Sequence, residues 1–453
     1  MDKYIFFIYK KVEQLFPKQI QTLINRIKIS SIGYRFASGM FWNLIGMLVS
    51  RGAILISMIF IARLLKKEIF GQLAIVQSTI ATFQIFAEFG MGLTTAKYVA
   101  EFKTTSLEKT GRIILLSNIV VLIISFILST ILFLLSPFLA AKILVAPHLK
   151  TALQISAFLF LLISWNAVQT GILVGLEAFR SITNVNLLGG ICSFFLLIIC
   201  TYFGKLNGAV LGLALSAGFN ALLNYIFLQK EIKKNNISFL SPIIKEDWKI
   251  LINFSLPVVL TGLMITLANW TCNTILINKV GYAELGIFNA ANQWFLVLIF
   301  LPRVVSQVTL PILSDYIGKK NKVDASKLFS LSVKINAIIS IFLVLILSFL
   351  SPMIMSCYGE GFSNSWPVLI VVLFTSALVA IHSPCADLIT ASGSLWSGLV
   401  INLGWSLIFI GLTIFLIKFG GMGLVTSRFI AYFIHTILLF LFIKKIFNQK
   451  KFN

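Results

Sequence analysis

The chain has 453 residues, of which 58% are hydrophobic and only 11% are charged, and its formal net charge at pH 7 is +22. A composition this apolar excludes an ordinary soluble fold. The basic residues are distributed around apolar runs and are not gathered in one domain, which argues against nucleic-acid binding. The sequence therefore predicts an integral membrane protein with many spans.

About twelve apolar runs are each long enough to cross a bilayer, which takes roughly 20 mostly apolar residues. Backbone groups in lipid must be hydrogen-bonded within the protein, and the runs show no alternation typical of a barrel, so all are predicted to be helices. The predicted spans are 39–62, 71–92, 113–136, 152–175, 185–203, 208–228, 250–277, 286–313, 329–350, 366–387, 395–417 and 421–443.

The loops between these spans differ in their basic charge. If the N-terminus is cytoplasmic, the inner loops and tails hold 26 of the 37 Lys and Arg residues, and the outer loops hold 8. The positive-inside rule then places both termini in the cytoplasm. Anionic lipid of the inner leaflet attracts such residues, so membrane lipid is an expected partner and nucleic acid is not.

Residues 1–36 form a basic segment with apolar residues interspersed. Their apolar run is too short for a secretory signal, and no small-residue cleavage site follows it. We expect a cytoplasmic or interfacial segment, either a helix on the membrane surface or a partly disordered tail. The five cysteines show no CxxC spacing and are expected to be inert thiols, most of them inside spans.

The chain resembles a tandem duplication of six spans. Gly71 aligns with Gly286, and Arg63 aligns with Lys279 after a one-residue slip in the turn. Both halves begin on the cytoplasmic side, so the repeats are parallel, and transporters commonly place their site between such repeats. The predicted domains are an N-terminal bundle (37–228), a cytoplasmic linker (229–249), a C-terminal bundle (250–445) and a cytoplasmic tail (446–453).

Spans one, two, seven and eight carry polar residues at helical spacing. Hydrogen bonding between helices explains any single Asn or Ser in such a span. Stripes at corresponding places in both halves instead favour a polar cavity between the halves. The residues predicted to line this cavity are Asn43, Gln84, Asn269, Asn273, Asn289, Gln293 and Gln307.

Three arginines fall inside spans, where a charge costs at least about 2.5 kcal/mol and normally faces a cavity or a partner. Arg51, Arg303 and Arg428 outnumber the one clear deep carboxylate, Glu88. Guanidinium groups bind phosphate in bidentate fashion, whereas surplus positive charge is a poor environment for a cationic drug. We therefore predict that the three arginines contact an anionic head group, such as a phosphate or a diphosphate.

Glu88 and Arg303 lie 215 positions apart, at equivalent places in the two halves. They are a candidate gate pair, which closes the cytoplasmic side of the cavity and parts when the cavity opens inward. A permanent packing pair is the equal alternative. His435, two turns from Arg428, is expected to be a hydrogen-bonded packing residue and not a proton carrier.

Nothing in the loops indicates an enzyme. The longest loop has about twenty residues and no Gly-rich phosphate cradle, and no metal-ligand cluster or nucleophile with a base can be identified. We predict no catalytic residues, no metal and no cofactor. Transport is then driven by a gradient, the membrane potential or the substrate itself, and not by bound ATP.

Residues 61–71 (IARLLKKEIFG), 89–101 (FGMGLTTAKYVAE) and 254–257 (FSLP) resemble polysaccharide flippases of the multidrug/oligosaccharidyl-lipid/polysaccharide exporter (MOP) superfamily. The resemblance implies a MATE-like, V-shaped transporter of two six-helix bundles. It also implies an O-antigen translocase (Wzx-type), or its capsule or exopolysaccharide equivalent. Such proteins move undecaprenyl-diphosphate-linked oligosaccharides from the inner to the outer leaflet of the bacterial plasma membrane.

Two departures favour this oligosaccharide branch. The lipid II flippases usually carry two further helices, and the multidrug branch usually carries an acid in its first or seventh span; this chain has neither. The implied partners are the lipid-linked oligosaccharide, a glycan polymerase and other export proteins. The alternative is a cation-coupled multidrug or small-molecule antiporter of the same superfamily.

Overall fold

The computed structural model describes residues 31–239, 242 and 244–448, and these residues form helices and short connections without a strand. An α-helix satisfies its backbone hydrogen bonds within one segment, as an apolar chain in lipid requires. Most of the predicted interfacial segment 1–36 and of the tail 446–453 lies outside the described residues.

Two helices of the N-terminal half continue through a kink. The backbone leaves helical angles at Lys66 in the first and at Lys205 in the second, and each kink falls in a predicted loop. Each of these helices therefore holds two predicted spans. The helices are α3 (Ser31–Glu88), α4 (Met91–Phe102), α5 (Leu107–Phe138), α6 (Lys150–Gly175) and α7 (Phe179–Lys234), with the π-helical turn η1 (Leu139–Ile143) and the 3-10 turn η2 (Pro147–Leu149).

Each long helix of the C-terminal half holds one predicted span. Pro384 lies inside the fourth of them without ending it. The long helices are α8 (Lys245–Lys279), α9 (Tyr282–Gly318), α10 (Lys322–Phe349), α13 (Trp366–Ala391), α14 (Leu395–Leu416) and α15 (Gly420–Asn448). The short ones are α11 (Ser351–Cys357), α12 (Glu360–Ser363) and the 3-10 turn η3 (Ile417–Phe419).

Within the described residues, eight continuous helical stretches are long and apolar enough to cross a membrane. Three of these, 46–102, 179–234 and 396–447, hold two predicted spans each, and α8 holds the predicted seventh span. Every predicted span therefore corresponds to a helix. The predicted all-α membrane fold is confirmed.

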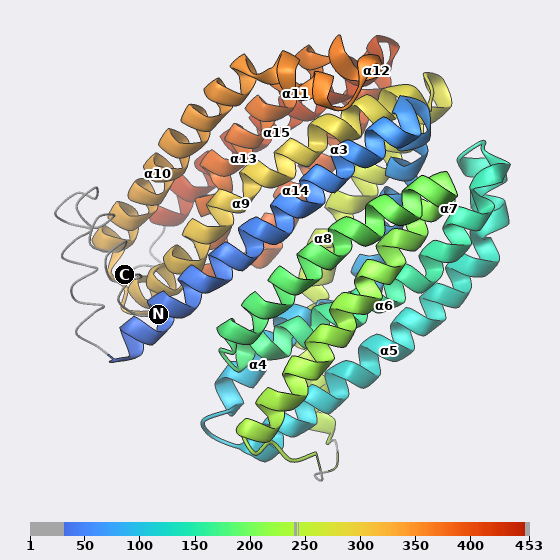
Figure 1. Cartoon of the computed structure of the whole chain (residues 1–453). Helices are drawn as coiled ribbons and strands as arrows, with labels where there is room; N and C mark the ends of the chain where they lie inside the picture. Colours follow the sequence, from blue (N-terminus) through green and yellow to red (C-terminus); the bar gives the residue numbers. More distant parts are fainter. Residues whose placement is uncertain (1–30, 240–241, 243, 449–453) are drawn as a thin grey trace, which may run out of the picture.

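The helices form two groups that lie side by side, with α3 running along the seam between them (Figure 1). α3 packs on α7 of its own half and on α9 of the other half. The start of α3 and the end of α15 lie at the same end of the molecule, which we call the terminal end (Figure 1). The opposite end, which holds the kinks of α3 and α7 and the turn between α8 and α9, we call the distal end.

The buried apolar residues form three clusters. The largest contains residues of both halves, such as Leu73 and Leu369, and extends from the distal end into the middle of the molecule. The second, around Ile113, belongs to the N-terminal half, and the third, around Leu388, belongs to the C-terminal half. The halves thus share a core at the distal end and have separate cores at the terminal end.

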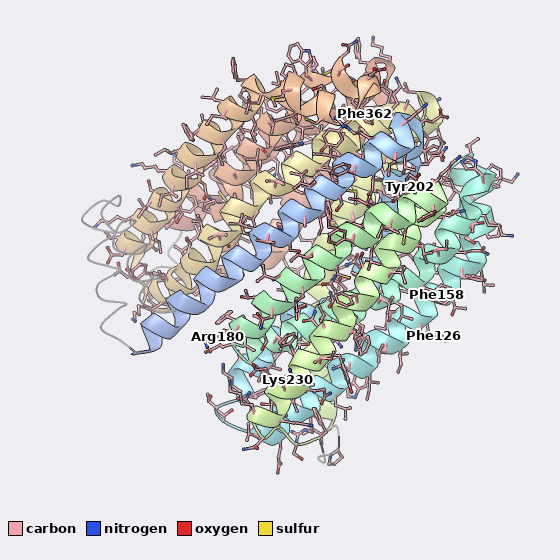
Figure 2. All side chains as sticks on the ribbon, viewed as in Figure 1. Phe126, Phe158, Arg180, Tyr202, Lys230 and Phe362 are labelled. Carbon is pink, nitrogen blue, oxygen red and sulfur yellow. The ribbon has the colours of Figure 1, made fainter. Side chains whose placement is uncertain are left out.

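Large apolar side chains also project from the outside of the molecule (Figure 2). Phe126, Phe158 and Tyr202 are 65%, 63% and 68% exposed. Arg180 and Lys230 lie toward the terminal end, away from this apolar belt. An apolar outer surface with charge at the helix ends is the surface of a bundle whose solvent is lipid.

Candidate functional site

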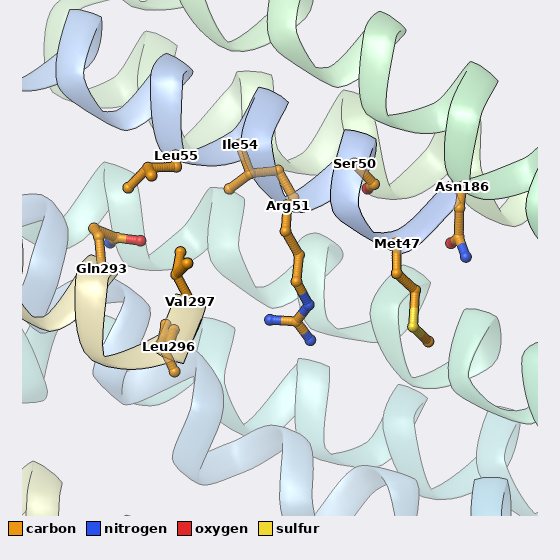
Figure 3. A pocket seen from close by; sticks show the side chains of 9 residues that line it. All are labelled: Met47, Ser50, Arg51, Ile54, Leu55, Asn186, Gln293, Leu296 and Val297. Atoms are coloured by element: carbon orange, nitrogen blue, oxygen red, sulfur yellow. The ribbon is translucent and has the colours of Figure 1, made fainter. Parts of the chain in front are cut away.

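A cavity of about 290 Å³ lies between the two halves, where α3 meets α7 and α9 (Figure 3). The five lining residues of α3 recur three and four positions apart, so one face of this helix forms the wall. Arg51 is the only charged residue of the lining. The nine lining residues are Met47, Ser50, Arg51, Ile54, Leu55, Asn186, Gln293, Leu296 and Val297.

Arg51 reaches from α3 into the space between the halves (Figure 3). Its guanidinium carbon lies 5.6 Å from the centroid of the Phe300 ring of α9, which is a cation–π contact. The ion pairs of the described residues do not include Arg51. A partly buried guanidinium without a carboxylate partner is a site where an anion binds favourably.

Arg303 lies on the same helix as Phe300 and its side chain is exposed. Its positive charge is close enough to Arg51 for the two guanidinium groups to repel one another. Two like charges facing one space destabilise each other until an anion enters between them. Arg51 thus lines the cavity, whereas Arg303 is not one of its lining residues. Contact between either arginine and a head group stays a prediction.

Three uncharged polar residues also line the cavity. Gln293 was among the predicted lining residues, whereas Ser50 and Asn186 were not. Asn186 belongs to α7, in the fifth predicted span, which carries no polar stripe like those of spans one, two, seven and eight. Asn184 directly precedes that span and Asn186 is its second residue, and this pair was the available sequence signal.

The other predicted lining residues are placed elsewhere. The Asn273 side chain donates to the Ser78 hydroxyl at 3.2 Å across the seam, and Asn269 donates to a backbone carbonyl of its own helix at 2.7 Å. Asn289 is 9% exposed, and its amide nitrogen has no partner among the described atoms. Two predicted residues have side chains outside the described set: Asn43 and Gln307.

The candidate gate pair is parted in this structure. The Gln84 amide donates to the Glu88 carboxylate at 2.5 Å, one turn away in α3. Among the described residues, the ion pairs do not join Glu88 to Arg303. The gate hypothesis has Glu88 and Arg303 apart when the cavity opens at the terminal end and paired in the other state. The pairing in that other state stays a prediction.

Arg428 lies inside the C-terminal half and does not line the cavity. It is 6% exposed, its Nη1 donates to Asn292 Oδ1 at 2.8 Å, and its guanidinium carbon lies 4.1 Å from the Phe295 ring centroid. The rings of Phe288 and Tyr432 are each at 5.8 Å. An aromatic cage of this kind stabilises a buried cation without a carboxylate. Contact between Arg428 and a head group stays a prediction.

His435 is buried near this cage, in contact with a second histidine. Its Nε2 lies 3.1 Å from the amide oxygen of Asn402, which only accepts, so this nitrogen donates. His382 Nδ1 lies 2.9 Å from the Thr436 hydroxyl, and the two imidazole centroids are 5.2 Å apart. These contacts are those of the packing role expected from the sequence.

A family model described as "Polysaccharide biosynthesis protein" matches residues 36–317. A multidrug resistance MATE family transporter of the MOP superfamily in its inward-facing conformation shares 17% identity over 90% of this chain and 98% of its own, with a TM-score of 0.74. The outward-facing conformation of such a transporter shares 16% identity over 90% of this chain and 95% of its own, with a TM-score of 0.66.

A third similar structure is a MOP superfamily transporter from Pyrococcus furiosus Vc1, for which a reversed polarity of the binding pocket suggests a different function. It shares 17% identity over 91% of this chain and 95% of its own, with a TM-score of 0.65. At these identities the likeness establishes the fold alone. No curated protein matches the chain.

Proposed function

Because the chain belongs to the polysaccharide biosynthesis protein family, we propose that it moves an undecaprenyl-diphosphate-linked oligosaccharide across the bacterial plasma membrane. The cargo is the repeat unit of an O-antigen, a capsule or an exopolysaccharide. It passes from the inner to the outer leaflet by alternating access, in which the two halves rock about the site between them.

The charge of the cavity is the observation that carries this proposal. Arg51 is the only charged lining residue, it has no carboxylate partner among the described residues, and Arg303 adds a second cation nearby. A diphosphate offers an anionic group to each guanidinium and relieves their mutual repulsion. The diphosphate of the carrier lipid is therefore the part of the cargo that we assign to these arginines.

The remaining lining fits a glycolipid as well. Ser50, Asn186 and Gln293 offer hydrogen-bond donors and acceptors to sugar hydroxyls. Ile54 and Leu296 both line the cavity and are 38% and 45% exposed, so part of its wall is apolar and accessible. In the proposed mechanism the head group enters this cavity while the polyprenyl tail stays in lipid.

The distribution of Lys and Arg supports a cytoplasmic position for the terminal end. The cores of the two halves are separate there and are joined at the distal end. With this orientation the structure is the state that receives its cargo from the cytoplasm, and the closed distal end faces the outside.

A cation-coupled antiporter of drugs or small molecules is the second candidate, and the fold shared with multidrug transporters supports it. The cavity disfavours a cationic drug, because Arg51 repels it and none of the nine lining residues is acidic. Drug efflux from membrane vesicles distinguishes the two candidates.

Mass spectrometry of polyprenyl-linked lipids tests the proposal in cells that lack this gene and any redundant flippase. We expect an undecaprenyl-diphosphate oligosaccharide to accumulate, and to return to the wild-type level on complementation with the wild-type gene but not with Arg51→Ala. Labelling of the glycan from outside excludes a blocked polymerase, because only a translocation defect leaves the glycan inaccessible. An unchanged lipid pool contradicts the proposal and favours antiport.

A further inference from the structure

Two of the hydrogen bonds that join the halves at the distal end are related by the internal repeat. Arg63, at the end of the first span in α3, donates from Nε to the backbone carbonyl of Cys357 at 2.5 Å. Asn278, at the end of α8, donates from Nδ2 to the backbone carbonyl of Ile143 at 3.1 Å. Cys357 ends α11, which follows α10, and Ile143 ends η1, which follows α5. We call these two contacts the distal clasps.

The distal clasps are images of one another under the internal repeat. Asn278 lies 215 positions after Arg63, and Cys357 lies 214 positions after Ile143. In each clasp, the end of the first span of one half holds the end of the third span of the other half. The structure thus places Asn278, and not the aligned Lys279, in the role of Arg63.

A reciprocal glycine contact lies between the two clasps. A Cβ atom on Gly71 would stand 1.8 Å from the carbonyl oxygen of Tyr282, and one on Gly286 would stand 2.0 Å from that of Lys67. Tyr282 follows Lys67 by the same 215 positions that separate the glycines. A segment of one half thus meets a segment of the other half, and the equivalent segments meet in the reverse order, as in a two-fold interface. Only glycine permits two backbones to approach so closely.

The carbonyls that accept these bonds belong to the last turns of helices, which carry partial negative charge and lack partners within the helix. A positively charged donor such as Arg63 is therefore favoured there. The second clasp is reinforced by Tyr282, whose hydroxyl donates to the carbonyl of Leu144 at 2.5 Å. Both clasps use backbone acceptors, so they close the distal end without a matched pair of charged side chains.

We propose that the two distal clasps and the glycine contact between them form the outer gate of this transporter, and that both clasps contribute to holding it shut. The inference rests on the alternation of the two halves in the proposed function and not on the identity of the cargo. It places the outer gate on the pseudo-two-fold axis, so parting of the halves breaks both clasps in one motion.

Distance measurements between spin labels test the gate without transport. The labels occupy Phe203→Cys and Phe349→Cys, which are 81% and 86% exposed in opposite halves near the distal end, in full-length protein whose native cysteines are replaced by Ser. In lipid nanodiscs, we expect Asn278→Ala to raise the ratio of long to short distances about fivefold, the factor that one ordinary hydrogen bond supplies. Arg63→Ala is expected to raise the ratio at least as much, because Arg63 donates as a cation.

Gly71→Ala and Gly286→Ala are expected to raise the ratio further and to similar extents, because each added methyl collides with a backbone carbonyl. The matched controls are Lys279→Ala, an exposed cation beside Asn278, and Gly411→Ala, whose Cβ would meet nothing within 4 Å; neither changes the ratio. Arg63→Lys, which keeps a charged donor, stays near wild type and shows that the effect is not misfolding.

An unchanged ratio in Arg63→Ala or Asn278→Ala, or an effect confined to one of the two clasps, overturns the proposal. Because the distances report conformation alone, that result leaves the proposed cargo untouched. A gate that opens as expected in a protein that moves no glycolipid would instead contradict the proposed function and not the gate.

Discussion

The two ends of the molecule are built from the same helices but are held by different contacts. At the distal end the halves share one apolar cluster, glycine backbones in contact and hydrogen bonds to backbone carbonyls. At the terminal end each half has its own core. Apolar packing, close backbone contacts and hydrogen bonds to backbone carbonyls thus join the halves at the distal end. In the proposed function the terminal end is where the anionic head group enters.

Helix α8 contacts helices of both halves. The first turns of α8, which follow the predicted linker, pack on the N-terminal half although the rest of α8 belongs to the other half. Arg112 pairs with Asp247 at 2.9 Å, and the hydroxyls of Thr94 and Ser255 lie 2.8 Å apart. These contacts tether the halves at the terminal end while their cores stay apart.

The largest effect is expected when the charge of Arg51 is removed from the cavity. Arg51→Ala should lower glycan export in a complemented deletion strain about 100-fold, because truncating one partner of a buried charge pair costs about 3 kcal/mol. Arg51→Lys should retain part of the activity, since it keeps the charge but not the bidentate geometry. Met47→Leu, a neighbouring lining residue, is the control. Normal export by Arg51→Ala would remove the cavity from the mechanism.

The α8 tether is predicted to be the next largest contribution. The side chains of Arg112 and Asp247 are 11% and 4% exposed, so Arg112→Ala leaves a buried carboxylate unpaired. We expect a loss of about 3 kcal/mol in the free energy of unfolding, measured in detergent with denaturant, and partial recovery in the double variant Arg112→Ala with Asp247→Asn. Lys103→Ala, whose partner Glu177 is 61% exposed, should change little. Equal effects of the two variants would argue against a buried tether.

A smaller effect is expected from a single hydrogen bond across the seam. The Trp270 indole donates to the Thr79 hydroxyl at 3.0 Å, between α8 and α3. Trp270→Phe keeps an aromatic ring but removes the donor, and should favour parting of the distal end by about 1 kcal/mol. The spin-label distances measure this shift, with the exposed Trp248→Phe as control. A shift toward the closed state would contradict the assignment of this bond to the sealed end.

The smallest effect belongs to the solvent-exposed rim of the terminal end. Lys319 and Asp315 form an i,i+4 pair at 2.8 Å, with side chains 70% and 52% exposed. Lys319→Ala should lower the free energy of unfolding by less than about 0.5 kcal/mol, because water and salt screen such pairs. A loss above about 1 kcal/mol would show that this rim carries structure that its exposure does not indicate.

The sequence predicted the spans, the repeat and two residues of the cavity lining, because these depend on local apolar runs and on polar or charged groups that lipid makes costly. Arg51 and Gln293 were predicted on that basis and line the cavity. Asn186 was missed because one polar residue in an apolar run does not say which way its side chain points. The cage around Arg428 was missed because its phenylalanines are indistinguishable from the apolar background of the spans.

Contacts between distant segments were beyond prediction for the same reason. The repeat aligned Gly71 with Gly286 correctly, yet alignment alone does not show that the two glycines face each other across the seam. The docking of α8 on the N-terminal half depends on Arg112 and Asp247, which lie 135 positions apart. A sequence pattern reports the face of a helix, whereas the partner of that face is determined by the packing of the whole bundle.

The most direct test of the account is translocation by the purified protein in liposomes that contain an undecaprenyl-diphosphate oligosaccharide with a fluorescent sugar. A membrane-impermeant quencher reports the glycan that reaches the outer leaflet over time. We expect the wild-type protein to expose the glycan of the inner leaflet and Arg51→Ala to match protein-free liposomes. Wild-type liposomes no faster than protein-free ones, or Arg51→Ala as fast as wild type, would contradict the account.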